Sequence, residues 1–132
     1  MKNPKFWVAV LAGGVVANII DFIVMGMLMA PTFAGIPSMR QDVNPIWFVF
    51  GDFIAVFVFM LVYDRVYSSF TAGPQGGATF GAYAGLMVSF PTWIFIHLMF
   101  TGFPYGLAWG LAIYGVIWGV IVGAVLGATY KK

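Results

Sequence analysis

The chain has 132 residues, of which 62% are hydrophobic and only 8% charged, and its formal net charge is +2. A soluble domain of this length needs a far more charged surface, so the composition excludes a soluble protein and indicates an integral membrane protein. The absence of cysteine excludes disulfides and cysteine nucleophiles, and no basic patch with interleaved aromatic residues is present to bind nucleic acid.

Four stretches of the chain are long and apolar enough to predict membrane-spanning helices, each of which needs about 20 mostly apolar residues. In chain order they cover residues 6–30, 46–63, 76–100 and 106–129. Short polar or Pro/Gly-rich connections separate them. We therefore predict an all-α integral membrane fold, in which residues 1–132 form one domain, a four-helix bundle.

The charges at the ends and in the connections predict the orientation of this bundle. With four spans, both termini and the second connection lie on one side of the membrane. Positively charged connections stay on the cytoplasmic side, so we expect both termini to be cytoplasmic, and we expect a bacterial cytoplasmic membrane. The basic residues on that side are Lys2, Lys5, Arg65, Lys131 and Lys132, and only Arg40 lies on the other side.

The first predicted helix contains two polar residues at membrane depth, Asn18 and Asp21. A carboxylate near mid-bilayer costs about 2.5–3.5 kcal/mol on insertion scales, so it normally faces a partner, a cavity or water. Asp21 lies roughly 13 Å below the outer end of its helix, and Asn18 is one turn away, close enough for a hydrogen bond. Asp21 is either a buried structural carboxyl group or part of a functional site.

The second predicted helix carries Asp52 roughly 9 Å below the same outer surface. Two carboxyl groups at similar depth on neighbouring helices could bind a proton or a cation, or hold a polar head group. The alternative is that Asp52, which follows Gly51 close to the interface, reaches water.

The third predicted helix places His97 in its last turn, again on the outer side, and Pro91 precedes it. We group His97 with Asp21, Asn18 and Asp52 as a candidate site for an ion, a proton or a polar partner. The simpler interpretation of His97 is a hydrogen-bonded side chain at the interface. A single histidine could also ligate a haem or chlorophyll axially, but no cofactor is predicted.

Glycines recur every four residues on the third and fourth predicted helices. This spacing forms a groove that lets another helix approach closely. The stripes either build the chain's own bundle, or the stripe on the fourth helix binds a second copy or another membrane subunit. The residues are Gly77, Gly81 and Gly85 on the third helix and Gly115, Gly119, Gly123 and Gly127 on the fourth.

Three of the predicted helices contain short motifs rich in small residues. The first helix leads to Met29-Ala30-Pro31, the third opens with residues 81–85 (GAYAG), and the last contains Tyr114 and ends with residues 123–127 (GAVLG). In these motifs the chain resembles an uncharacterised family of small four-helix bacterial membrane proteins, a domain of unknown function. The resemblance implies the four-helix membrane fold and transfers no catalytic residue.

These observations favour a protein without enzymatic activity. The chain shows no nucleophile motif, no HExxH and no phosphate-binding loop, so neither catalytic residues nor a metal site are predicted. The first hypothesis is an accessory or assembly subunit that docks in the bilayer on a larger membrane complex or on itself, through the glycine stripe of the fourth helix. The alternative is a small oligomeric transporter or channel, linked to protons or cations, that uses Asp21 and Asp52.

Overall fold

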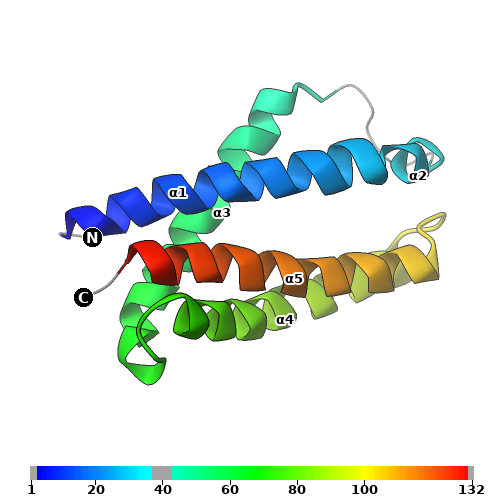
Figure 1. Cartoon of the computed structure of the whole chain (residues 1–132). Helices are drawn as coiled ribbons and strands as arrows, with labels where there is room; N and C mark the ends of the chain where they lie inside the picture. Colours follow the sequence, from blue (N-terminus) through cyan, green and yellow to red (C-terminus); the bar gives the residue numbers. More distant parts are fainter. Residues whose placement is uncertain (1–2, 37–42, 131–132) are drawn as a thin grey trace.

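The computed structural model of the chain describes residues 3–36 and 43–130, and these residues are almost entirely helical (Figure 1). Four helical segments are long and apolar enough to cross a membrane, namely Pro4–Leu28, Pro45–Ser69, Pro74–Met99 and Tyr105–Thr129. No strand occurs in these described ranges. The prediction of an all-α membrane protein with four spanning helices is confirmed.

The helices begin slightly earlier than predicted because asparagine and proline cap them. The Asn3 side chain accepts a hydrogen bond from the backbone N–H of Lys5 at 2.9 Å, and α1 (Pro4–Asp21) starts there. Asn44 does the same for Ile46 at 3.1 Å, so α3 (Pro45–Val66) starts at Pro45. Such a cap satisfies a backbone N–H that has no partner within the helix, and proline fits the first position.

The first spanning helix changes its geometry directly after Asp21. The segment η1 (Phe22–Leu28) is a π-helix, and the backbone N–H of Met29 bonds to the carbonyl of Val24 at 2.8 Å, five residues back. A short helix, α2 (Ala30–Ala34), then follows with Pro31 in its first turn. A π-helix is rare and frequently marks a functional site. The sequence analysis predicted one uninterrupted helix over residues 6–30, and in this respect it was wrong.

The second spanning helix extends beyond its predicted end at residue 63. α3 continues to Val66, and a 3₁₀ turn, η2 (Tyr67–Ser69), completes it. The charged residue Asp64 is retained in the helix because it accepts a hydrogen bond from the Tyr130 hydroxyl.

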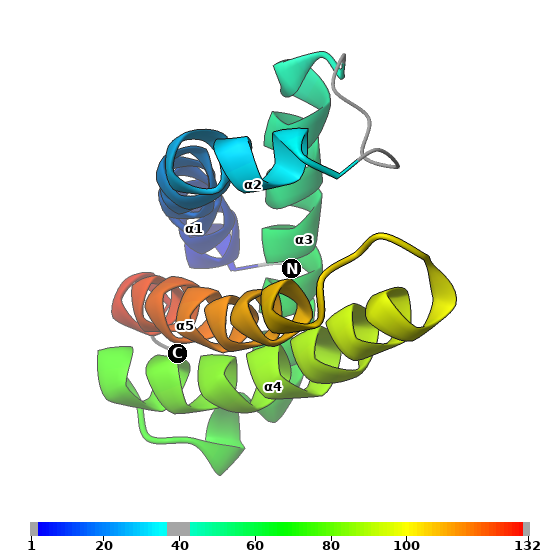
Figure 2. The ribbon, with the colours of Figure 1, turned by 90° about the vertical axis from the view of Figure 1, so that its right-hand side faces the viewer.

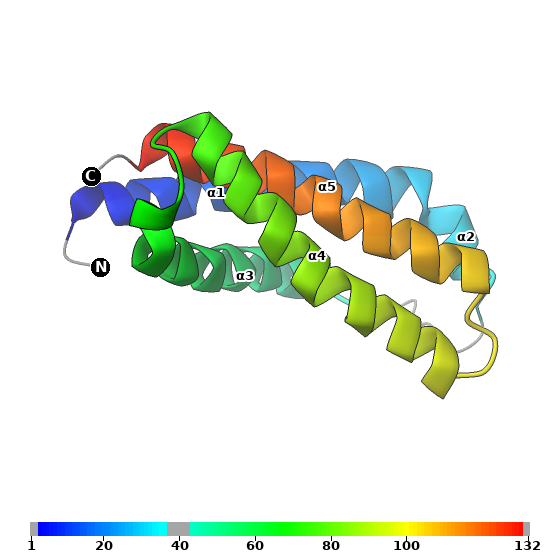
Figure 3. The same cartoon turned by 90° about the horizontal axis from the view of Figure 1, so that it is seen from below.

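α4 (Pro74–Met99) and α5 (Tyr105–Thr129) pack side by side along their length, and α1 packs on both α5 and α3 (Figures 1 and 2). α3 contacts α4 little. It is inclined to α1 and α5 in Figure 1, and α4 passes obliquely across it in Figure 3. Both ends of the described chain and the α3–α4 turn lie together, and we call this the terminal end (Figure 1). Lys2, Arg40, Lys131 and Lys132, on which the predicted orientation depends, lie outside the described residues.

The glycine stripes of α4 and α5 face each other. A Cβ atom placed on Gly81 would lie 1.8 Å from the carbonyl oxygen of Gly119, and one on Gly77 would lie 2.0 Å from that of Gly123. Backbone therefore touches backbone, which only glycine permits. The stripe on the last helix therefore packs on α4, which is the first of the two alternatives given above.

Two apolar clusters fill the interior at different heights. The larger, toward the terminal end, contains Ala17 of α1, Val56 of α3 and Val122 of α5. The smaller, toward the opposite end, contains Leu111 and Phe103, with Met25 packed against them. Between these two clusters, α1, α3 and α5 carry polar side chains.

Candidate functional site: two carboxyl groups and a tyrosine

Three helices each contribute one polar side chain to a single cluster, which we call the carboxyl cluster: Asp21, Asp52 and Tyr114. The Tyr114 hydroxyl of α5 donates a hydrogen bond to Asp21 Oδ1. Asp52 of α3 lines the same groove as Asp21 and Tyr114. The sequence prediction that these two aspartates belong to one site agrees with this geometry.

Two carboxyl groups that line one groove inside the spanning segments have a chemical consequence. Two like charges in a medium of low polarity would repel each other. A proton held by either carboxyl group would remove this repulsion. The Tyr114 hydroxyl donates a hydrogen bond to Asp21, which stabilises negative charge on that group.

The cluster lies inside the spanning segments. Asp52 follows the start of α3 by seven residues, and Tyr114 follows the start of α5 by nine, which places them about 10 and 13 Å along their helices from the end opposite the termini. Asp21 is the last residue before the π-helical segment. A change in the geometry of η1 would therefore move the Asp21 side chain.

The carboxyl cluster lines a large groove. The groove has a volume of about 1440 Å³ and is bounded by α1 with η1, by α3, and by α4 and α5. Its walls are mainly apolar and include Trp47, Phe59, Trp93 and Trp118. Pockets that bind small molecules typically have this character, with a few polar groups that fix the ligand's orientation.

Asn18 and His97, the other two residues of the predicted site, do not join the cluster. The Asn18 side-chain amide donates to the carbonyl of Gly14 at 2.8 Å, although the residue lines the groove. Asn18 thus bonds to the backbone one turn back, and the described contacts of Asp21 are with Tyr114 instead.

His97 lies at the end of α4, away from the carboxyl groups. Its Nδ1 atom is 2.7 Å from the carbonyl oxygen of Phe103, and its ring contacts Tyr105 with centroids 5.0 Å apart. His97 thus holds the α4–α5 connection against the start of α5. Grouping it with the aspartates was wrong, because similar depth in the membrane does not bring two helix faces together.

Tyr114 was missed as a site residue. The sequence contained a usable signal, because a tyrosine hydroxyl in the middle of a spanning helix normally needs a hydrogen-bond partner. The only acidic side chains at comparable depth were the two aspartates.

A second polar pair lies at the terminal end. The Tyr130 hydroxyl donates to Asp64 Oδ1, and Tyr130 is 1% exposed. Burial, and then the bond to Asp64, raises the pKa of Tyr130 above its usual value of 10.0. The neighbouring Tyr63 hydroxyl is buried and has no hydrogen-bond partner within the described residues.

We expect Tyr130→Phe to lower the free energy of unfolding by about 1 kcal/mol at neutral pH, because one hydrogen bond is lost. The tyrosine stabilises the fold below pH 10.0, and this contribution is lost as the pH rises through its raised pKa. The melting temperature of the wild type should therefore fall more steeply above pH 10.0 than that of the variant. Thermal unfolding in detergent, followed across this pH range, measures both effects, and identical slopes would contradict the assignment.

The described residues contain no group of three or more His, Cys, Asp or Glu side chains that could hold a metal ion. The carboxyl cluster supplies two carboxyl groups and one hydroxyl. Calcium requires six to eight oxygen ligands and magnesium near-octahedral geometry. The chemistry of the cluster therefore fits a proton better than a hard divalent cation.

The fold and the site define an integral membrane protein with four spanning helices, in which two carboxyl groups and a tyrosine line one groove. No protein-family model, no curated protein and no solved structure matches the chain. The resemblance to the family of small four-helix bacterial membrane proteins stays a prediction.

Proposed function

We propose that the protein is a small proton-linked membrane transporter, in which the carboxyl cluster binds the coupling proton. One observation supports this above all: two carboxyl groups from different helices line one groove inside the spanning segments. Ionisable groups at such depth are costly, and they mark ion pathways and proton relays.

The arrangement suits reversible proton binding. A proton on one carboxyl group neutralises it, while the hydrogen bond from Tyr114 stabilises charge on Asp21. Loss of the proton leaves two negative charges in one groove, which repel each other and push α1 and α3 apart. The π-helical segment next to Asp21 is an element that can absorb such a movement. Proton binding and helix position are thereby coupled.

The accessory-subunit hypothesis has less in its favour. It relied on a glycine stripe of the last helix being available to a partner, and that stripe packs on α4. The exposed apolar side chains of the four helices need no protein partner, because lipid covers such surfaces in a membrane. A bacterial cytoplasmic membrane and cytoplasmic termini stay predictions.

Infrared spectroscopy of the purified protein in detergent or lipid tests the proposal. A protonated carboxyl group has a carbonyl band that is distinct from the bands of a carboxylate, so a pH titration follows the proton directly. We expect the wild type to lose one such band on alkalinisation, and Asp52→Asn to lack it.

Asp64→Asn is the matched control, because it removes a carboxyl group of the same span outside the groove. This variant should retain the band that Asp52→Asn lacks. A wild-type protein without a titrating carboxyl band, or an Asp52→Asn variant that keeps it, would refute the proton site.

A further inference from the structure

The described lining of the groove carries acidic groups and no basic ones. Among these residues, the ionisable groups are Asp21, Asp52 and Tyr114, and no lysine, arginine or histidine accompanies them. Even with one proton bound, the two carboxyl groups leave the groove with negative charge that no basic side chain of the described lining compensates. Within a membrane such charge requires a positive partner.

The remaining walls fit an aromatic, apolar ligand. Trp47, Phe59, Trp93 and Trp118 line the groove from α3, α4 and α5. Aromatic faces attract cations, most strongly where water is excluded. The volume of about 1440 Å³ exceeds that of typical pockets for drug-sized molecules, which measure about 300–1,000 Å³.

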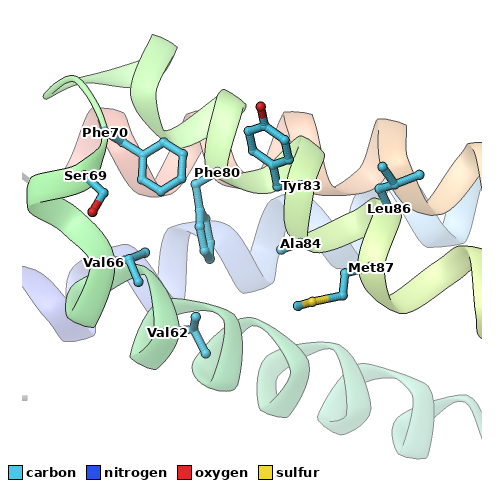
Figure 4. A pocket seen from close by; sticks show the side chains of 9 residues that line it. All are labelled: Val62, Val66, Ser69, Phe70, Phe80, Tyr83, Ala84, Leu86 and Met87. Atoms are coloured by element: carbon cyan, nitrogen blue, oxygen red, sulfur yellow. The ribbon is translucent and has the colours of Figure 1, made fainter.

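A second pocket adjoins the groove. It is apolar, has a volume of about 500 Å³ and lies between α3 and α4 near their connection, and Val62, Phe80, Ala84 and Met87 line both pockets. Figure 4 shows Phe80 and Met87 extending from α4 into the space beside Val62 of α3. The two pockets are thus neighbours across the gap where α3 and α4 scarcely touch. A ligand dissolved in the bilayer can reach the carboxyl cluster by this route.

We propose that the groove binds a lipophilic aromatic monocation, which enters from the membrane between α3 and α4 and displaces a proton held by Asp21 or Asp52. This inference rests on the proposed function and names its substrate class. One positive charge replaces another, so the charge of the site stays constant. A neutral or anionic molecule of the same shape cannot make this exchange.

Tetraphenylphosphonium and tetraphenylborate test the proposal, because they share size and shape and differ in the sign of their charge. Binding to the detergent-solubilised protein is measured by isothermal titration calorimetry, and protons released into weakly buffered solution are counted in parallel. We expect the phosphonium to bind with release of one proton per ion, and more tightly as the pH rises. Tetraphenylborate should bind at least about tenfold more weakly than tetraphenylphosphonium, which means a Kd at least tenfold higher.

The variants locate the site. Asp21→Asn and Asp52→Asn should each weaken phosphonium binding by at least about tenfold, and Asp64→Asn should leave it unchanged. Equal binding of both ions, or unaltered binding in the two groove variants, would overturn the proposal. The proton count on the wild type tests it even if a variant fails to fold, since binding without proton release contradicts the exchange.

The outcome also separates this inference from the proposed function. If the infrared titration detects the proton but the phosphonium does not bind, the substrate class is wrong and the proton site stands. If neither is observed, both proposals fail.

Discussion

Replacing Gly81 by leucine will prevent α4 from packing on α5, and little folded protein will be recovered. A Cβ atom at this position would lie 1.8 Å from the carbonyl oxygen of Gly119 and 2.5 Å from its carbonyl carbon. These are backbone atoms, which cannot rotate away as a side chain can. Overpacking a tight interface typically costs about 1–3 kcal/mol and occasionally more, and we expect the upper end here. Thermal unfolding in detergent, together with the yield of monodisperse protein, measures the loss.

Gly110→Leu is the matched control for Gly81→Leu. Gly110 belongs to the same helix pair, but a Cβ atom there meets nothing within 4 Å. The same substitution should therefore leave the melting temperature close to that of the wild type. If both variants are equally stable, the backbone contact between α4 and α5 is wrong; if both fail, the effect is one of leucine in a spanning helix and does not report on the contact.

Hydropathy predicted the four spanning helices because each must place about 20 apolar residues across the bilayer, and this requirement leaves a strong signal. Their ends were predicted less well. The caps by Asn3 and Asn44 add residues before the apolar run starts. Asp64 stays helical through its bond to Tyr130, 66 residues away, and no local pattern reveals such a partner.

Depth in the membrane, estimated from helical rise, predicted only part of the candidate site. Asp21 and Asp52 were predicted at similar depth, and they line one groove because α1 and α3 pack on each other. His97 was placed at similar depth by the same reasoning but bonds to Phe103 in its own connection. The sequence specifies height in the membrane through helical rise, whereas the rotation of each helix depends on packing partners that only the structure identifies.

The π-helical segment η1 is the part of the site that the sequence predicted least well. Periodicity analysis assumes 3.6 residues per turn, so a wide turn after Asp21 shifts every later residue to a different face. Met25 and Met29 consequently pack on the cluster near Leu111, while Met27 is 60% exposed. A helical wheel with 3.6 residues per turn could therefore not predict which way the side chains beyond Asp21 face.

Asp21→Asn should abolish proton-coupled transport while the protein still accumulates and folds. Asparagine has nearly the same shape, and its amide can accept a hydrogen bond from Tyr114. The variant keeps the Asp52 carboxyl group but lacks the charge of Asp21, so its protonated groove holds no negative charge to attract the cation. Proteoliposomes with a trapped pH-sensitive dye measure the effect, with tetraphenylphosphonium added outside and protein-free vesicles as baseline.

We expect wild-type vesicles to export protons on addition of the cation, and Asp21→Asn vesicles to match the protein-free baseline. Asp64→Asn should behave as the wild type, because its carboxyl group lies at the terminal end, outside the groove. Two results would contradict the proposed role. Undiminished proton export by Asp21→Asn would place the coupling group elsewhere. Failure of Asp21→Asn to accumulate, together with normal proton export by Asp52→Asn, would make Asp21 a structural residue whose partner is Tyr114.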